Sequence, residues 1–386
     1  MQVKFHSSID EIEPSSWNRL VHDGNPFLKH EFHAALEHHD CVGARFGWLP
    51  SHLTVSQAGR IVGLSPLYIK SNSYGEFVFD HAWADAYQRN GLRYYPKLVS
   101  AIPYTPAFGE RLLVDEKADV SEVRRAMVEA TLQLTQNSKH SSMHWLFTTE
   151  VEGVLLKEMG LLERLGVQFH WHNADYENFD DFLSRLTAKR RKNILRERRR
   201  VTESGITFRR LHGQEVTSEE WGIFAAFYAK TFEERYSLPT LNAGFFQEIG
   251  ERLGDQVVLV LAYHQHQCVA GALLYRSDSV LYGRHWGGVA QLDSLHFEAC
   301  YYQGIDYAIE EKIAHFEPGA QGEHKIWRGF LPTFTRSYHW IADQQFRLAI
   351  DDFLRRERPA IVNYEKQLQM SSPYRCDEPR KNQLTK

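Results

Sequence analysis

Three short apolar runs in the second half of this chain constrain its fold more than any other feature. Val257 to Tyr263, Cys268 to Tyr275 and Val280 to Trp286 are rich in Val, Leu and Tyr, and polar turns separate them. Such runs predict three consecutive strands, a meander. From Leu295 to Ile309 the apolar residues recur at three-to-four spacing, which predicts an amphipathic helix directly after the last strand. The helix would place its N-terminal amides beside the end of that strand, where a carbonyl or phosphate can be held.

Length and composition favour two domains. The chain has 386 residues, of which 43% are hydrophobic, enough to bury more than one core. It has no run of about 18 to 20 apolar residues, and its polar start lacks the apolar centre of a signal peptide. We therefore expect a cytoplasmic protein without a transmembrane segment. The four cysteines show no CxxC spacing, which argues against a disulfide framework and a thiolate zinc site.

The same order of elements is expected twice. In the first half we expect strands at 3–7, 52–56, 60–69, 76–80, 143–148 and 167–172, and helices from residue 14 and at 30–39, 120–136 and 152–162. The second half adds a strand at 206–211 and helices at 219–235 and 245–253 around the meander. Residues 59–83 also match 266–286, sharing a Leu-Tyr pair and a closing His and Trp. A repeat near 208 residues indicates two copies of one α/β domain.

This element order resembles the GNAT superfamily of N-acyltransferases, and the tandem pair resembles Fem-type aminoacyltransferases of peptidoglycan synthesis, particularly their FemAB-like relatives. The closer likeness lies in 81–113, in GRHWG followed by LHFEACYYQGIDYAI, and in 319–340. It implies an α/β (α+β) fold of two GNAT-like domains with mixed sheets flanked by helices. We place these at 1–165 and 166–370, the latter including a basic helix at 182–203, with a flexible tail at 371–386.

The resemblance implies transfer of an acyl or aminoacyl group to an amine in peptidoglycan or cell-wall precursor metabolism. The co-substrate would be acyl-CoA or aminoacyl-tRNA, with no tightly bound cofactor, and the oligomeric state stays open. A rival interpretation is a non-catalytic protein that recognises peptidoglycan precursor or RNA. A coenzyme-A-linked acetyltransferase is a third, weakened because the Gln/Arg-x-x-Gly-x-Gly/Ala phosphate loop is absent from 287–291.

A basic segment from Lys189 to Arg200 holds eight basic residues and one acid in a chain of net charge -4. Helical spacing places Lys189, Lys192, Arg196 and Arg199 on one side, in a stripe about 15 Å long. A solvated helix face is the simpler interpretation. The excess of charge favours contact with a polyanion such as tRNA, coenzyme A or an anionic cell-wall precursor.

Acylation of an amine needs a base to remove a proton and donors for the developing oxyanion. His285, at the end of the third meander strand, or Glu298, in the following helix, would be the base. Tyr302 or Tyr95 would be the acid or an orienting group. The alternative for His285 is a hydrogen-bonded structural histidine beside Trp286.

The remaining candidates come from two further segments. The proline-rich segment with Tyr94 and Lys97 predicts a pocket wall, or else a stiff packed loop. Donor or anion contacts are expected from Arg284, Lys325 and Arg328, and substrate contacts from Trp286 and His324, although charges near 325 could instead be a solvated strand edge. The pairs His264/His266 and His170/His172 lack a third ligand, so no metal site is predicted.

Overall fold

The computed structural model describes residues 1–234, 236–289, 292–320 and 322–375. A small sheet contains, in spatial order, β1 (Gln2–His6), β3 (His52–Gln57), β4 (Arg60–Ser65) and β7 (Leu113–Val114). A large sheet runs through β10 (Ile206–His212), β11 (Val257–His264), β12 (Gln267–Arg276), β13 (Val280–Gly288), β14 (His315–Glu317), β9 (Leu162–His172), β15 (Leu331–Ile341), β8 (Ser142–Leu146), β6 (Lys97–Ser100), β5 (Tyr68–Lys70) and β2 (Trp48–Pro50).

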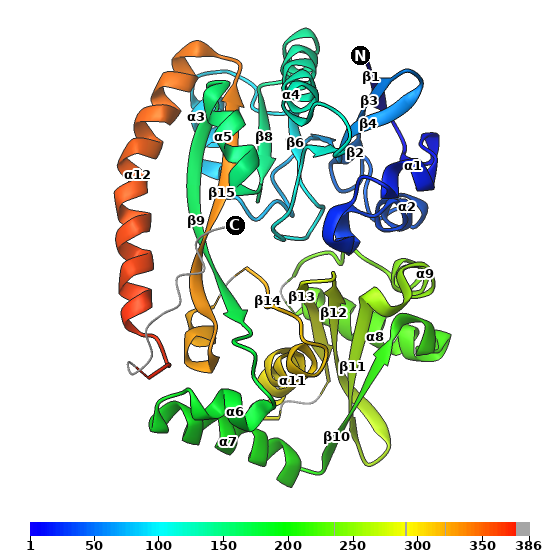
Figure 1. The fold of residues 1–386 in the computed structure, drawn as a ribbon, viewed down its shortest axis with the longest axis vertical. Coiled ribbons are helices and arrows are strands. Elements are labelled where there is room, and N and C mark those ends of the chain that lie inside the picture. The colour runs from blue at the N-terminus through cyan, green and yellow to red at the C-terminus, as the bar shows by residue number, and fades with distance from the viewer. Residues whose placement is uncertain (235, 290–291, 321, 376–386) are drawn as a thin grey trace.

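Helices cover these sheets in two lobes (Figure 1). The first lobe carries α1 (Pro14–Asn18), α2 (His30–His38), α3 (His81–Arg89), α4 (Val120–Asn137) and α5 (Glu150–Glu158). The second lobe carries α6 (Phe179–Ser184), α7 (Ala188–Glu203), α8 (Ser218–Glu233), α9 (Ala243–Leu253), α10 (Leu295–Phe297) and α11 (Gln303–Glu310). A π-helical turn, Glu298–Tyr302, joins α10 to α11. Among the described residues, no helix combines the length and the apolar character needed to cross a bilayer.

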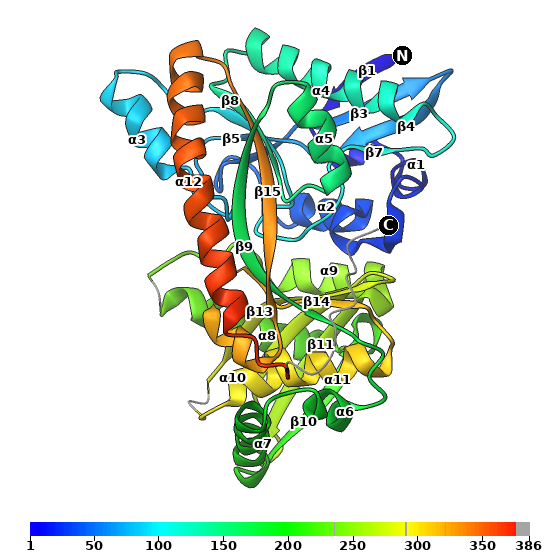
Figure 2. The same cartoon turned by 60° about the vertical axis from the view of Figure 1, so that its left-hand side comes forward.

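Two long strands join the lobes into one sheet. β9 pairs with β15 from Leu162 to His170 and then with β14 through Trp171 and His172. β15, although it follows the second lobe in sequence, lies between β9 and β8 of the first lobe. The last helix, α12 (Gln344–Met370), packs along this strand pair (Figure 2). The predicted division at 165/166 falls inside β9, and the domain boundaries stay a prediction.

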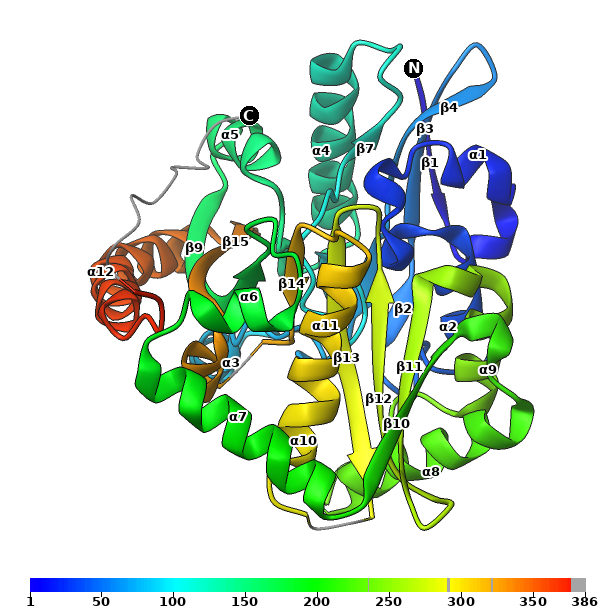
Figure 3. The ribbon, with the colours of Figure 1, turned by 60° about the horizontal axis from the view of Figure 1, so that its bottom comes forward.

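The central strands of the second lobe are buried on both faces, which explains their nearly continuous apolar sequence. Alternate residues of β11 face opposite cores: Leu259 and Leu261 pack with the aromatic residues of α8 and α9, whereas Val258 and Val260 pack with α11. Figure 3 shows α10 and α11 on one face of these strands and α8 and α9 on the other. The predicted meander and its flanking helices are therefore present.

Two predictions for the first lobe are wrong, one of a strand and one of a sequence match. Residues 76–80 form no strand, because β6 pairs with β5 in the expected place. His81 and Trp83, matched in sequence to the end of β13, instead begin α3. Trp83 packs in a cluster with Ile341 and Ile350 of the C-terminal strand and helix. Because that cluster is built by residues more than 250 positions later, local sequence carries no signal for it.

The single basic helix expected at 182–203 is also wrong, because the chain breaks between α6 and α7. At the break, Leu186 forms a β-bridge with Tyr374, and the amide of Thr187 donates to the carbonyl of Pro373 at 2.8 Å. The C-terminal segment thus supplies backbone partners for residues that leave the helix. Part of the predicted flexible tail is therefore bound to the second lobe, while residues 376–386 lie outside the described residues.

We expect Gly287→Ala to destabilise the second lobe. A Cβ at Gly287 would lie 2.2 Å from the carbonyl oxygen of Phe227 on α8, a contact that backbone atoms cannot relieve by changing a rotamer. Forcing the helix away from β13 should lower the free energy of unfolding by about 1 to 3 kcal/mol, measured by urea denaturation.

The matched control is Gly222→Ala on the same helix, where no atom lies within 4 Å of the added Cβ. Alanine there should raise stability by about 0.5 to 1 kcal/mol, because glycine costs that much in a helix interior. Equal stability of the Gly287 variant and wild type would contradict the close approach of α8 to β13.

Candidate functional site

One edge of β13 is open along most of its length. β14 pairs with it only from Val280 to Tyr282, and from Gly283 to Gly288 the described partners lie on β12 alone. A bulge in that pairing leaves Arg284 as the extra residue. An unpaired edge presents backbone N–H and C=O groups that can bind an extended ligand. This edge can therefore offer backbone groups to a ligand, apart from the carbonyls of Gly283 and Trp286, which accept from Arg284 at 3.0 Å and from Thr231 at 3.2 Å.

A pocket of about 80 Å³ lies at this open edge. Its walls come from β12, β13, α10, the π-helical turn and the loop after β14: Ala272, Leu273, Leu274, Gly283, Arg284, His285, Trp286, His296, Cys300, Tyr301 and Pro318. Among the predicted site residues, the structure brings Arg284, His285 and Trp286 together here. π-helical turns occur often at functional sites, and the side chains of Cys300 and Tyr301 come from one.

Arg284 is a buried cation with one free donor. Its terminal nitrogens donate to the carbonyl of Gly283 at 3.0 Å, to that of Glu317 at 2.9 Å and to the Glu317 carboxylate at 3.0 Å. Its guanidinium also lies over the rings of Phe27 and Tyr282. Its Nε is buried without a partner among the described residues. Because a buried unpaired donor is costly, this N–H is a candidate donor to an oxygen of a ligand.

His285 lies in an aromatic shell formed by Tyr228, Phe246 and Tyr275. Burial, and then the charge of Arg284, lowers the pKa of this histidine to about 3. The imidazole is therefore neutral near pH 7 and a weak base. Its ring packs on the α8 and α9 side of β13, whereas the pocket lies toward α10 and the π-helical turn.

Lys325 lies near the β13 pocket without lining it, and its pKa is close to neutral. It is 2% exposed, and its Nζ donates to the carbonyl of Gly319 at 2.8 Å. Burial, and then the charge of Arg284, lowers the pKa of Lys325 to about 7, and it also interacts electrostatically with Cys300 in the pocket wall. A group that titrates near the working pH is suited to proton transfer. The sequence marked Lys325 as an anion contact but gave no signal of its burial.

Glu298 does not line the pocket. Its carboxylate accepts from Arg198 at 3.1 and 3.2 Å and from Gln303 at 2.9 Å. Burial raises the pKa of Glu298 despite the arginine. The structure therefore pairs this candidate base with α7 and separates it from His285.

Tyr302 and Arg328 lie in a second buried network, on the side of the π-helical turn that meets α7. The Tyr302 hydroxyl donates to Glu197, and Arg328 donates to Glu197 at 2.8 Å and to Tyr302 at 3.1 Å. These contacts tie α7 to the helix that lines the pocket. By contrast, His324 reaches the pocket wall, since its Nε2 lies 3.1 Å from the hydroxyl of Tyr301.

The candidates from the first lobe form a buried network of their own. The Lys97 side chain is 0% exposed and donates to Glu76 at 2.8 Å, to Asp80 and to Ser73. Tyr94 donates to Asp80 at 2.6 Å, and the Tyr95 hydroxyl lies 2.8 Å from that of Ser73. Lys97 is thus closed to a substrate in this structure. The predicted pocket wall is placed inside the lobe and is not brought to the β13 pocket.

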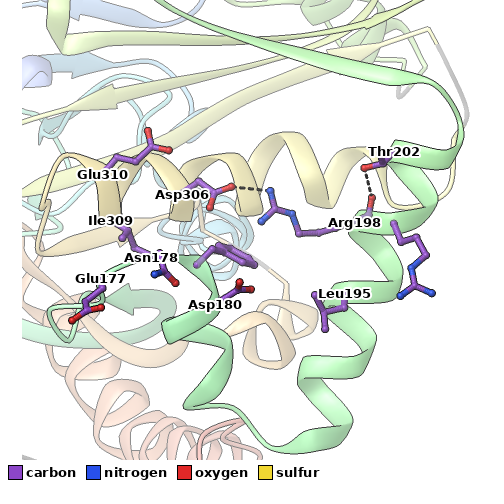
Figure 4. Close-up of a pocket in the computed structure, with 11 residues that line it drawn as sticks. Glu177, Asn178, Asp180, Leu195, Arg198, Thr202, Asp306, Ile309 and Glu310 are labelled. Carbon is purple, nitrogen blue, oxygen red and sulfur yellow. Dashed lines mark hydrogen bonds and ion pairs between the residues drawn. The ribbon is translucent and has the colours of Figure 1, made fainter.

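A larger groove of about 600 Å³ lies between α6, α7 and α11 (Figure 4). It is lined by Glu177, Asn178, Phe179, Asp180, Leu195, Arg198, Arg199, Thr202, Asp306, Ile309 and Glu310. Arg198 crosses it, pairing with Asp306 at 2.7 Å and stacking 4.3 Å from the Phe179 ring centre. Of the residues predicted from the sequence, Arg199 of the basic stripe lines this groove. Because Arg198 is already satisfied by carboxylates, we assign the chemistry to the β13 pocket.

The predicted basic stripe is on the surface. Lys189, Lys192 and Arg196 are exposed on the outer side of α7, whereas Ile194 and Val201 are buried on its inner side. Among the described residues, Arg199 at the end of the stripe lines the groove, whereas Lys189, Lys192 and Arg196 line neither the groove nor the β13 pocket. Sequence periodicity correctly predicted that these cations lie on the side of the helix opposite Ile194 and Val201. The ligand of the stripe stays a prediction.

Comparisons with known proteins agree with this architecture. The sequence profile of the FemAB-like family, described as peptidoglycan biosynthesis/recognition, matches residues 8–376. The crystal structure of FemX is similar at a TM-score of 0.54 and 14% identity, covering 91% of this chain and 100% of that chain. The C-terminal domain of a putative lysylphosphatidylglycerol synthetase from Agrobacterium fabrum is similar at 0.56 and 10%, covering 90% and 96%.

A tandem GNAT protein from the clavulanic acid biosynthesis pathway also matches, at a TM-score of 0.47 and 10% identity, covering 89% of this chain and 98% of that chain. The search of curated proteins found no match. At these identities the structural likenesses speak for the fold alone.

Proposed function

The chain belongs to the FemAB-like family of peptidoglycan biosynthesis and recognition, and on that premise we propose that it transfers an acyl or aminoacyl group to an amine of a peptidoglycan precursor. The expected fold of tandem GNAT-like domains is confirmed. The observation that carries the proposal is the edge of β13 without a strand partner, beside a pocket lined by Arg284, whose buried Nε–H has no partner among the described residues. An extended donor can pair with that edge while its carbonyl enters the pocket.

In the proposed reaction the acceptor begins as an ammonium and must lose a proton. Lys325, with a pKa of about 7, accepts it directly or through a water. The amine nitrogen then attacks the donor carbonyl, and the Nε–H of Arg284 together with backbone N–H groups of β13 stabilises the oxyanion. As the tetrahedral intermediate collapses, the proton held by Lys325 passes to the leaving group, and the second proton of the attacking nitrogen passes to the now neutral Lys325 and then to water. His285 is not the base, since its pKa is about 3 and its ring packs against Tyr228, Phe246 and Tyr275.

The donor class follows from the same surface. Acyl-CoA and aminoacyl-tRNA both present an activated carbonyl at the end of an extended group. The sequence after β13 lacks the glycine spacing of a coenzyme A phosphate loop, and Ala290 and Gln291 of that segment lie outside the described residues. This favours a donor that is held mainly along the strand edge, and it makes aminoacyl-tRNA the first donor to test.

The decisive experiment is a transfer assay read by mass spectrometry. The protein is incubated with a soluble UDP-linked muropeptide and either a pool of charged tRNA or a panel of acyl-CoA species. The proposal expects the muropeptide to gain the mass of one acyl or aminoacyl group. The muropeptide could instead bind saturably without gaining mass, whichever donor is added and at every pH from 6 to 9. That result would favour the alternative in which this chain recognises the precursor without catalysis.

A pocket-filling variant tests where the acyl group lies. Cys300→Leu adds bulk inside a pocket of about 80 Å³, so it should raise the KM for the donor by about 10-fold or more, the scale of one methylene in an apolar pocket. Steady-state kinetics at saturating acceptor measure the change.

Cys268→Leu is the matched control, because this residue lies on β12 outside the pocket. It should leave the KM within about twofold of wild type. A Cys300 variant with an unchanged KM would place the acyl group elsewhere.

A further inference from the structure

Several basic residues of α7 form no ion pair with the described residues, and Lys189, Lys192 and Arg196 among them are exposed on its outer side. Ion pairs occupy Arg198, through Glu298 and Asp306, and Arg200, through Asp293. The other basic residues of the helix form no ion pair with any described residue: Lys189, Arg190, Arg191, Lys192, Arg196 and Arg199. Because charges left unpaired on a folded surface repel each other, such a set indicates an anionic partner.

Exposed apolar side chains flank these cations. Leu195 on α7, which also lines the groove described above, is 43% exposed, and Trp327 is 49% exposed. The guanidinium of Arg190 lies 4.9 Å from the Trp327 ring centre, which fixes the indole beside the start of the helix. A helix face that combines Lys and Arg with exposed Leu and Trp is typical of elements that lie in a membrane interface. Nucleic acid would recognise the cations but would gain little from the leucine.

The position of α7 suits a flat partner. In Figures 1 and 2, α7 lies at the lower end of the molecule, below the strands of the second lobe and opposite α4. It projects from this end, so a plane can approach it. The rest of the chain, whose net charge is about -11 when the segment from 189 to 200 is set aside, would be repelled by the same anionic surface. An anionic plane would therefore bind the protein by this end only.

We propose that the outer face of α7, with Leu195 and Trp327 at its flanks, docks the protein onto an anionic phospholipid bilayer. The inference is independent of the β13 pocket and of the transfer reaction. Each cation near an anionic surface contributes about fivefold to binding, and Leu195 and Trp327 enter the acyl boundary. Salt should weaken docking, since the Debye length falls from about 10 Å at 0.1 M to 3 Å at 1 M.

The test is co-sedimentation of the full chain with vesicles. We expect binding to vesicles of phosphatidylcholine with one quarter phosphatidylglycerol, and little binding to pure phosphatidylcholine. The triple variant Lys189→Glu, Lys192→Glu and Arg196→Glu should lower the partition coefficient on the order of 100-fold. Trp327→Ala should lower it several-fold while leaving the salt dependence unchanged.

The matched control reverses the charge of three exposed residues in and beside α4, at the opposite end of the molecule: Lys117→Glu, Arg125→Glu and Lys139→Glu. It carries the same change of net charge and should bind as wild type does. Equal loss in both triple variants would show a net-charge effect and overturn the proposal. So would retention of unmodified tRNA at 0.15 M salt without vesicle binding, which would assign the face to nucleic acid.

Discussion

Lys325→Met is expected to lower kcat for acyl transfer by at least about 100-fold, because loss of a positioned proton-transfer group costs about 10² to 10⁴ in rate. The variant keeps the length of the side chain and removes only the ionisable group. Transfer by the wild-type protein should rise with pH through about 7, as Lys325 loses its proton. In the variant that rise should disappear, which separates a role in proton transfer from one in packing.

Stability provides the second readout for this variant. Burial lowers the pKa of Lys325 from 10.5 to about 7, so between these values the unfolded chain holds a proton that the folded chain has released. The contribution of Lys325 to the free energy of unfolding therefore rises with pH from 7 to 10.5. Below pH 7 the buried lysine is charged, and its destabilising effect is at its maximum. Lys325→Met should unfold at a higher temperature than wild type at pH 6, with the difference shrinking toward pH 10.

The control for Lys325→Met is Lys366→Met, an exposed lysine on α12, which should change neither kcat nor the pH profile. A Lys325 variant that keeps more than a tenth of wild-type kcat would remove this residue from the mechanism. It would leave the open edge of β13 and the donor on Arg284 as the site.

Lys97→Met should destabilise the protein by about 3 to 5 kcal/mol, the usual cost of removing one partner from a buried ion pair. Lys97 lies between the carboxylates of Glu76 and Asp80, and all three side chains are at most 3% exposed. Burial would lower the pKa of Lys97, but the two carboxylates raise it above its ordinary value. Methionine fills the space and leaves both carboxylates without a cation.

The pH dependence identifies the mechanism of that loss. Even with Lys97 present, burial raises the pKa of Glu76 to about 7. Without the cation both carboxylates become harder to ionise, so the deficit should be small at pH 4 and grow as the pH rises toward 8. Urea denaturation at these two pH values measures it.

Adding Glu76→Gln and Asp80→Asn to Lys97→Met should restore part of the lost stability at pH 8, because a neutral network avoids the buried charges. A deficit that does not change with pH, or that the added substitutions deepen, would assign the effect of Lys97 to packing.

The sequence predicted the second lobe well because its signals are local. The apolar runs of β11 to β13 and the period of α8 and α9 need no distant partner to be recognised. The first lobe was predicted less well after Lys70, since α3 is held by Ile341 and Ile350, which arrive much later in the chain. Likewise, the break before α7 depends on backbone contacts from residues 373 and 374.

The candidate site shows the same difference between local signals and contacts from distant residues. Arg284, His285 and Trp286 were found from sequence because they follow one another on a predicted strand, and the structure places all three at the pocket. Glu298 and Tyr302 were proposed from helical spacing. Their orientation toward α7 depends on a π-helical turn and on two arginines from other segments, which spacing does not reveal. The lowered pKa of Lys325 depends on burial, which exists only in the folded chain.

The placement of β15 between β8 and β9 has a consequence for synthesis on the ribosome. Residues 331–341 are translated after the whole second lobe, yet they supply the strand that completes the sheet of the first. Until they emerge, β8 and the outer part of β9 have unpaired edges exposed to other nascent chains. The amino-terminal lobe, though made first, must therefore finish folding last, and a message truncated before codon 331 would yield an aggregation-prone fragment.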